Sequence, residues 1–375
     1  MEQKEVVIIG GGLAGLTAAI HLSKVGIKVI LIEKNSFPKH KVCGEYISNE
    51  ILPYLNWLDV DILSLKPTHI DKLQFSISNG KTINTTLPLG GFGISRYTLD
   101  AFLYDKAIAN GCEVIQDNVE AIDFTDFIFT VKTLRGSVYK TPAVLGAFGK
   151  RSNIDQKMNR GFIQKKSHWL AVKAHYSGSF DDTVVGLHNF KGGYCGVSKV
   201  EEGKINICYL ADYKTFKQYK NIEDYQQQVV QKNPVLKAIF KECIPVFEKP
   251  LTISQISFDK KQPVENHILM IGDSAGLIHP LCGNGMAMAI HSAKIASELL
   301  YHYYSGTVKS RPELEDAYNS KWKSQFGQRL KTGRMLSDLL QKPNLSKILM
   351  RIFIMFPALL QIIIKKTHGK PITIS

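Results

Sequence analysis

The chain has 375 residues, of which 44% are hydrophobic and 21% charged, and its 47 Lys and Arg against 33 Asp and Glu give a formal net charge of +14. This balance is typical of a globular protein with a large core, and it excludes a disordered chain, a collagen-like repeat and a small disulfide scaffold. The length predicts two or three domains. The positive charge leaves three kinds of partner open, namely nucleic acid, an anionic membrane surface and an acidic substrate.

A Gly-rich turn between two predicted strands is the first informative segment. The run Val6-Val7-Ile8-Ile9 is apolar and β-branched, which is typical of a fully buried parallel strand. A G-x-G-x-x-G pattern follows, and after it come a predicted helix and a second strand that ends in an acid. In chain order the segment comprises the strand 6–9, Gly10, Gly12 and Gly15, the helix 16–25, the strand 28–32 and Glu33.

Each residue of this pattern has a physical task in binding a dinucleotide. Gly10 allows the tight turn, Gly12 lets the backbone approach a pyrophosphate, and Gly15 lets the helix pack closely on the strand. The free N–H groups at the helix start then face the phosphates. Glu33 can accept hydrogen bonds from a ribose diol, and an acid there disfavours a 2′-phosphate, so the segment predicts FAD or NAD rather than NADP.

A second segment with ligand-binding features lies far downstream. Residues 268–271 form another predicted buried strand, and Gly272-Asp273 stands at its carboxyl end, where open α/β sheets bind ligands. An acid at this place can accept a hydrogen bond from a sugar-like hydroxyl chain. Residues 280–285 then predict a Pro- and Gly-rich turn, followed by a long helix through Leu300.

These motifs together resemble the FAD-dependent oxidoreductase superfamily that includes aromatic hydroxylases, or group A flavin monooxygenases, and geranylgeranyl reductases. Lys41-Val42-Cys43-Gly44-Glu45 is similar to the Cys-Gly motif of the geranylgeranyl-reductase-like members. Arg96-x-x-Leu99-Asp100-x-x-Leu103 is similar to a family helix whose Arg lies beside the cofactor. The resemblance implies an α/β fold in which a Rossmann-like FAD-binding domain is joined to an α+β substrate domain with a mainly antiparallel sheet and to a C-terminal helical segment.

The expected domains alternate along the chain, as they do in this superfamily. We predict a discontinuous FAD-binding domain over 1–65, 93–160 and 260–305, and a substrate domain over 66–92 and 161–259. Residues 306–375 form a basic C-terminal helical segment. The segments of the substrate domain alternate in polarity as half-buried strands do.

The resemblance also assigns the FAD contacts. One departure concerns Phe148, which replaces the acid of the hydroxylase Gly-Ala-Asp-Gly motif and removes a residue associated with reduction of the flavin by a nicotinamide. The expected FAD-binding residues are Gly10, Gly12, Leu13, Ala14 and Gly15 at the pyrophosphate, Glu33 and Lys34 at the ribose, Cys43 and Arg96 beside the cofactor, Gly272 and Asp273 at the ribitol chain, and Pro280, Gly283, Asn284, Gly285 and Met286 along the flavin ring.

Three residues are candidates for catalysis, each with a structural alternative. His279 can act as an acid or base, or it can bond a backbone group. Glu45 can protonate a substrate, or it can form a surface salt bridge. Tyr194 can hydrogen-bond a substrate oxygen, or it can pack in a core. Cys43 and Cys282 are either reactive thiols or small packing residues, and no metal site is predicted.

The resemblance favours a monooxygenase that hydroxylates a hydrophobic aromatic or polyketide-type substrate through a flavin C4a-hydroperoxide, with NADH or NADPH as the transient reductant. The alternative is a geranylgeranyl-reductase-like enzyme that saturates alkenes of an isoprenoid lipid. A third hypothesis is a flavoprotein that carries electrons without turnover of its own. The isolated Trp residues lack the Trp-x-Trp-x-Ile-Pro motif of flavin halogenases.

The basic charge is concentrated at the end of the chain. Residues 320–375 hold 11 Lys and Arg and one acid, Asp338, and they contain the apolar run Ile348–Ile364. This run can form an interfacial helix on anionic lipid, a cap over an apolar pocket, or a helix packed on the domain. No nucleic-acid-binding pattern appears. The six scattered Cys and the absence of a signal-peptide pattern predict a cytoplasmic protein, with peripheral contact at the inner membrane face as an added expectation.

Overall fold

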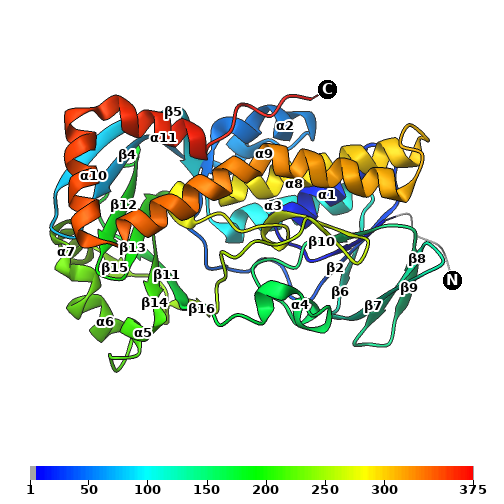
Figure 1. The fold of residues 1–375 in the computed structure, drawn as a ribbon, viewed down its shortest axis with the longest axis horizontal. Coiled ribbons are helices and arrows are strands. Elements are labelled where there is room, and N and C mark those ends of the chain that lie inside the picture. Colours follow the sequence, from blue (N-terminus) through cyan, green and yellow to red (C-terminus); the bar gives the residue numbers. More distant parts are fainter. Residues whose placement is uncertain (1–5, 375) are drawn as a thin grey trace.

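The computed structural model describes residues 6–374, with the side chain of Pro343 left out. A six-stranded sheet lies toward one end of the molecule and a nine-stranded sheet toward the other (Figure 1). Helix α9 (Arg311–Leu340) runs lengthwise between them, from beside α8 (Gly285–Tyr304) to the C-terminal helices.

The six-stranded sheet is a parallel Rossmann-like sheet with one antiparallel edge strand. Strand β1 (Val6–Ile9) pairs in parallel with β2 (Val29–Glu33) on one side and with β10 (Val144–Gly146) on the other. All three strands are buried, with the exposed fraction of Glu33 reaching only 9%, which explains their continuous apolar sequences. The remaining strands are β6 (Glu113–Gln116) beside β2, β18 (Ile268–Met270) beside β10, and the antiparallel β17 (Val264–Glu265).

Three helices cover this sheet and fix the glycine turn. Helix α1 (Leu13–Lys24) is buried from Leu13 to Leu22, and it packs against α8 and α3 (Arg96–Ala109). It begins three residues earlier than predicted, because Leu13 and Ala14 continue the buried face directly after the glycines. The Rossmann-like fold expected from the sequence is confirmed.

The nine-stranded sheet, called the roof sheet below, is mainly antiparallel, as expected. Residues on alternate positions of each strand face opposite sides. In β11 (Trp169–Ser177), Val172 and Ala174 pack with the helices α5 to α7, whereas Lys173 and His175 point toward the FAD-binding side. Helices α5 (Tyr213–Phe216), α6 (Ile222–Gln228) and α7 (Pro234–Glu242) therefore close the outer face. The order is β15 (Ile244–Pro245), β11, β14 (Ile205–Asp212), β13 (Gly193–Lys199), β12 (Val184–Phe190), β4 (Thr68–Ser76), β5 (Thr82–Gly93) and β3 (Tyr46–Ser48), with β16 (Leu251–Ser254) also paired to β11.

Two features of the architecture were not predicted. Strand β3 joins the roof sheet although it lies within residues 1–65, so the chain enters this sheet earlier than the expected boundary. A separate three-stranded antiparallel sheet lies within 93–160, beyond the parallel sheet (Figure 1). Its strands are β7 (Val119–Thr125), β8 (Ile128–Thr133) and β9 (Val138–Thr141), and the short helices α2 (Leu52–Trp57) and α4 (Asn153–Lys157) complete this half of the molecule.

The apolar run near the C-terminus forms two helices rather than one. Helix α10 (Pro343–Met355) is followed by Phe356, which is not helical, and α11 (Pro357–Thr367) continues after a bend of 109°. Pro357 causes the break, because proline has no N–H to donate and forces the preceding residue out of the helical conformation. Within residues 6–374 the structure contains no single helix long and apolar enough to cross a membrane, and only this bent pair meets that length and hydropathy jointly.

Candidate active site

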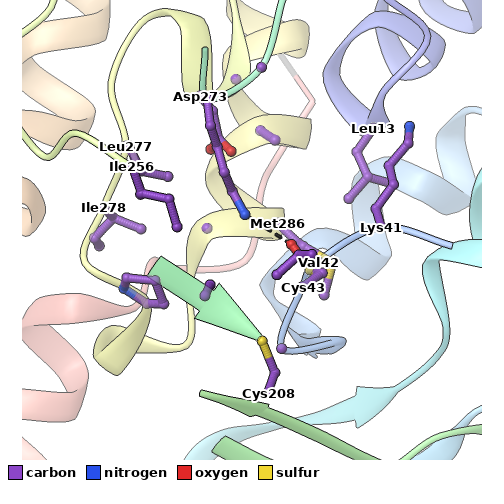
Figure 2. A pocket seen from close by; sticks show the side chains of 18 of the residues that line it. Leu13, Lys41, Val42, Cys43, Cys208, Ile256, Asp273, Leu277, Ile278 and Met286 are labelled. Carbon is purple, nitrogen blue, oxygen red and sulfur yellow. Dashed lines mark hydrogen bonds between the residues drawn. The ribbon is translucent and has the colours of Figure 1, made fainter. Parts of the chain in front are cut away.

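A cavity of about 850 Å³ lies between the glycine turn of the parallel sheet and the inner face of the roof sheet. Figure 2 looks into it, where Leu13, Cys43, Asp273 and Cys208 converge from four different elements. Fifteen of the 16 residues expected to contact FAD line this cavity. The exception is Gly15, which lies one turn into α1.

The three glycines have different surroundings. A Cβ at Gly15 would lie 1.9 Å from the carbonyl oxygen of Gly10, and a Cβ at Gly10, whose φ is +108°, would lie 2.3 Å from that of Ala147. A Cβ at Gly12 would meet nothing closer than the Arg96 guanidinium at 3.9 Å. Gly10 and Gly15 are therefore required by backbone packing, whereas Gly12 leaves space open to the cavity. Gly12 also caps α1 without a side-chain hydrogen bond, so the first-turn N–H groups have no side-chain cap.

An acid marks the carboxyl end of β2 beside this turn. Glu33 accepts hydrogen bonds from the N–H of Gly11 at 2.7 Å and from the N–H and side-chain amide of Asn35 at 2.9 and 2.6 Å. Lys34 lines the same part of the cavity. The turn and the strand end thus place hydrogen-bond donors and a carboxylate side by side.

Two cations lie on the other side of the glycine turn. Asp100, fully buried in α3, accepts from Arg96 Nε and Nη2 at 2.7 and 2.8 Å and from Lys41 Nζ at 2.8 Å. Burial alone would raise the pKa of Asp100, but Arg96 and Lys41 hold it below its usual range. The carboxylate therefore fixes both cations next to the open space at Gly12, where they favour a bound anion.

The second motif forms the opposite wall. Asp273 follows β18 in a short 3₁₀ turn over Gly272–Ser274, and its backbone oxygen accepts from Lys261 Nζ at 2.7 Å. A second 3₁₀ turn, Pro280–Cys282, leads through Gly283, with φ +62°, to the start of α8. Gly283 supports this left-handed conformation because it has no Cβ.

A hydrogen-bonded set holds this turn to the C-terminal segment. The amide of Asn284 donates to Glu50 Oε2 at 3.1 Å and accepts from Arg329 Nη1 at 3.2 Å, and Arg329 also pairs with Glu50 at 3.1 Å. The N–H of Gly369 donates to Glu50 as well. The residues after α11 are therefore fixed beside the start of α8.

A buried ion cluster joins the cavity to the roof sheet. Glu45, fully buried with φ +53°, accepts from Lys173 Nζ and His175 Nε2, each at 2.6 Å, and from the N–H of Arg96 at 2.8 Å. Burial would raise the pKa of Glu45, but the hydrogen bonds and positive charge of His175 and Lys173 lower it below its usual value. The neighbouring His40 has its pKa lowered to about 4, by burial first and then by Lys173 and His175. Of the three clustered side chains, Glu45 is the one that lines the cavity.

The far part of the cavity has an apolar wall. Strands of the roof sheet supply one side of this wall, and the inner faces of α9, α10 and α11 supply the other. In the core cluster at this point, side chains of α10 and α11 pack with those of β4 and β5. The lining side chains are Leu73, Phe75, Leu87, Val185 and Leu187 from the sheet, and Leu340, Leu349, Phe353, Leu360 and Ile363 from the helices.

Comparison with known proteins agrees with this geometry. Residues 5–42 match the family model described as FAD dependent oxidoreductase. The chain is 26% identical over 347 residues to the digeranylgeranylglycerophospholipid reductase of Methanosarcina acetivorans, covering 86% of this chain and 81% of that protein. It is 25% identical over 349 residues to the FAD-dependent monooxygenase janM of Penicillium janthinellum, covering 82% of this chain and 70% of that one. The solved structure of the flavin-dependent brominase Bmp2 superposes with a TM-score of 0.81 at 18% identity over 98% of this chain and 93% of that one.

These similarities identify the chain as an FAD-dependent oxidoreductase. The resemblance inferred from the motifs is therefore confirmed, and so is the choice of FAD over NAD.

The residues of this FAD-dependent oxidoreductase fit the cofactor. Gly12 leaves open the space that a diphosphate needs, the uncapped start of α1 offers N–H donors, and Arg96 with Lys41 supplies positive charge. Glu33 and Asp273 place carboxylates at the ends of two parallel strands, where hydroxyl groups of the ribose and ribitol can donate to them. Phe148 lines the cavity as well.

His279 does not reach the cavity wall. Its Nδ1 accepts from the N–H of Leu281 at 3.4 Å, so its proton lies on Nε2, which donates to the Ser337 hydroxyl at 2.9 Å. Burial lowers the pKa of His279 to about 3, so the ring is neutral. The structure thus favours the structural alternative, a histidine that caps a turn, over the catalytic one.

The other catalytic candidates do line the cavity. Tyr194 presents its side chain beside Leu210 and Leu281, and burial raises the pKa of its hydroxyl well above the ordinary value. Glu45 is not at the surface, so the alternative of a surface salt bridge is wrong. Burial raises the pKa of Cys282 and of Cys208 to about 12, which keeps both thiols protonated.

Sequence reasoning missed the partners of Glu45 and the apolar wall. Lys173 and His175 occupy alternate positions of an otherwise apolar strand, and a charged residue at such a position is a signal of an internal partner. The wall residues carry no comparable signal, because Leu, Val and Phe at core spacing occur in every buried strand and helix.

Proposed function

We propose that this FAD-dependent oxidoreductase saturates carbon–carbon double bonds of an isoprenoid lipid. The observation that carries the proposal is the continuity of one cavity, from the glycine turn to a chamber lined by Leu, Val, Phe and Ile of the roof sheet and C-terminal helices. A long polyene chain needs such a wall, because its apolar surface must leave water to reach the cofactor. Similarity to a protein named digeranylgeranylglycerophospholipid reductase and the Cys43-Gly44 pair support the same reaction.

The chain's residues would divide the work as follows. Bound reduced FAD supplies the hydride for one alkene carbon, and a proton completes the other carbon. Gly12, Arg96 and the start of α1 hold the diphosphate, Glu33 holds the ribose, and Asp273 holds the ribitol chain. The apolar wall excludes water and keeps the chain extended beside the Pro280–Gly285 turn.

The ion cluster is the proposed proton source. Glu45 lines the cavity, and its two carboxylate oxygens accept hydrogen bonds from Lys173 Nζ and His175 Nε2, with N···O distances of 2.6 Å each. A carboxylate between two proton-bearing groups can accept a proton from one side and release it on the other. His40, whose ring centroid is 5.2 Å from that of His175, extends the cluster outward.

A monooxygenase acting on a hydrophobic aromatic or polyketide-type substrate is the second candidate. Similarity to the FAD-dependent monooxygenase janM motivates it, and Tyr194 offers a cavity-facing hydroxyl to a substrate oxygen. Phe148 at the position of the hydroxylase acid weighs against it. NADH or NADPH remains the predicted reductant for either reaction.

An anaerobic reoxidation assay separates the two reactions. The protein is reduced with NADH, NADPH or dithionite, and reoxidation of the flavin is followed after adding geranylgeranyl lipid or an aromatic phenol. The reductase proposal expects reoxidation by the lipid, with two hydrogens gained per double bond. A parallel assay in air, with NADH or NADPH as reductant, measures oxygen uptake. Oxygen consumption that depends on the phenol, without reaction of the lipid in the anaerobic assay, would support the monooxygenase instead.

A cavity-filling variant tests the role of the apolar wall. Leu73→Trp places an indole in the part of the cavity where the sheet meets α10 and α11, so the lipid chain loses room there. We expect kcat/KM for the geranylgeranyl lipid to fall by about tenfold or more, which corresponds to about 1.4 kcal/mol. FAD content stays unchanged. Leu134→Trp, at a side chain that is 61% exposed, is the matched control and leaves both quantities unaltered.

A further inference from the structure

The outer face of α10 carries an apolar stripe. Leu345, Ile348, Ile352 and Met355 recur at helical spacing, with exposed fractions of 38%, 51%, 37% and 70%. Their opposite face is buried, with Phe353 at 4% lining the cavity. The helix is therefore apolar on two sides, and only one of them is covered by the protein.

The stripe continues across the bend into α11. Phe356 at the bend is 56% exposed, and Leu359 and Ile362 are 41% and 48% exposed. Among the described residues, eight of the 19 large hydrophobic side chains that are exposed lie within 345–362. Single exposed apolar residues are ordinary, but this concentration on two adjoining helices marks an interaction surface.

The charge around the stripe has one sign. Lys347 and Arg351 flank it on α10, Lys365 and Lys366 end α11, and residues 343–367 contain no acid. An apolar stripe bordered only by cations complements an anionic bilayer, where the apolar side chains enter the acyl boundary and the cations contact phosphate. A nucleic acid would match the charge but would leave the apolar stripe in water.

We propose that α10 and α11 form a docking surface for an anionic lipid bilayer. The bend at Phe356 and Pro357 lets two short helices lie in the interface, although neither is long enough to cross it. Their inner faces line the substrate cavity, so a single helical layer separates the bilayer from the cavity. The proposal that this surface binds a bilayer does not depend on the reaction. The further idea that a lipid substrate moves from the bilayer into the cavity rests on the proposed function.

Vesicle flotation of the full-length holoprotein tests the docking surface. The probes are phosphatidylcholine vesicles with and without one quarter phosphatidylglycerol. We expect the wild type to bind the anionic vesicles, and we expect this binding to weaken as the salt concentration rises. The Lys347→Glu/Arg351→Glu variant is expected to lose about tenfold or more in binding, since basic residues beside an anionic surface contribute to the attraction. Ile348→Glu/Ile352→Glu, placed on the exposed stripe, is expected to lose binding as well.

The control is Phe127→Glu/Leu134→Glu, which removes two apolar side chains beside the three-stranded sheet that are more exposed, at 70% and 61%, than Ile348 and Ile352. Equal flotation of this control and both α10 variants would overturn the proposal. A second outcome would also overturn it. In that outcome the wild type is a dimer in light scattering and floats with neither vesicle, and the Ile348→Glu/Ile352→Glu variant is a monomer, because a second copy then covers the stripe. Turnover of detergent-dispersed lipid reports the reaction separately, so loss of docking and failure of the proposed reaction are distinguishable.

Discussion

The glycine turn and the apolar wall are two ends of one cavity, and they are built in opposite ways. The turn uses backbone: Gly10, Gly12 and the start of α1 come from a few consecutive residues whose positions depend on the absence of a Cβ. The wall uses side chains from β4, β5, β12, α9, α10 and α11, which span residues 73 to 363. A site made of backbone leaves a fixed pattern in the sequence, whereas a site made of apolar side chains leaves only ordinary core composition.

The largest expected effect concerns the ion cluster that joins these two ends. Glu45→Gln leaves Lys173 buried without a counter-charge and is expected to lower the free energy of unfolding by about 3–5 kcal/mol, measured by denaturant titration at pH 7. Because the folded pKa of Glu45 is lowered, its contribution is present above the unfolded value of 4.5 and is lost as the pH falls through the folded value.

A double variant serves as the control for this prediction. Adding Lys173→Met to Glu45→Gln removes the unpaired cation and is expected to restore part of the stability. If the Glu45→Gln protein were as stable as the wild type, the ion cluster of Glu45, Lys173 and His175 would not stabilise the contact between the glycine turn and the roof sheet.

The second effect acts on the glycine turn alone. Gly12→Val points into the open space beside Arg96, so FAD retention is expected to fall about 100-fold or more while the fold survives, since each tenfold in affinity is only about 1.4 kcal/mol. Flavin absorbance after gel filtration and far-UV circular dichroism measure the two quantities. Gly161→Val, where a Cβ meets nothing within 4 Å, is the control. Normal flavin retention in Gly12→Val would refute the assignment of this turn.

The smallest expected effect is a change at His279, just before the Pro280–Cys282 turn, in how the free energy of unfolding depends on pH. His279 lies against Phe258 and Ser337, and burial lowers its folded pKa from 6.5 to about 3. Its contribution is therefore complete above pH 6.5 and is lost as the pH falls toward 3. His279→Asn, which keeps a capping acceptor, should reduce the stability loss between pH 7 and pH 5 by about 2 kcal/mol. The exposed His69→Asn is the control, and an unchanged pH slope in His279→Asn would show that the ring is not buried neutral.

The elements of the parallel sheet could be predicted because sequence-local chemistry determines them. Strands β1 and β2 are continuous apolar runs, and both flank a turn that requires glycine. The prediction of one helix over 348–364 is wrong, because Pro357 divides this apolar run into α10 and α11. The entry of β3 into the roof sheet and the three-stranded sheet β7 to β9 depend on pairings between strands, which no local pattern specifies.

The sequence by itself determined that the chain binds a dinucleotide and that its positive charge is concentrated after residue 320. Both conclusions follow from residue type and spacing alone, because a glycine turn and a net charge do not depend on distant contacts. Only the tertiary structure decided that Glu45 is a buried, paired carboxylate, that His279 caps a turn, and that α10 and α11 have one face on the cavity and one face outside. These features depend on which surfaces meet when the chain folds. A Glu, His or Ile can be buried in one fold and exposed in another even when its sequence neighbours are the same.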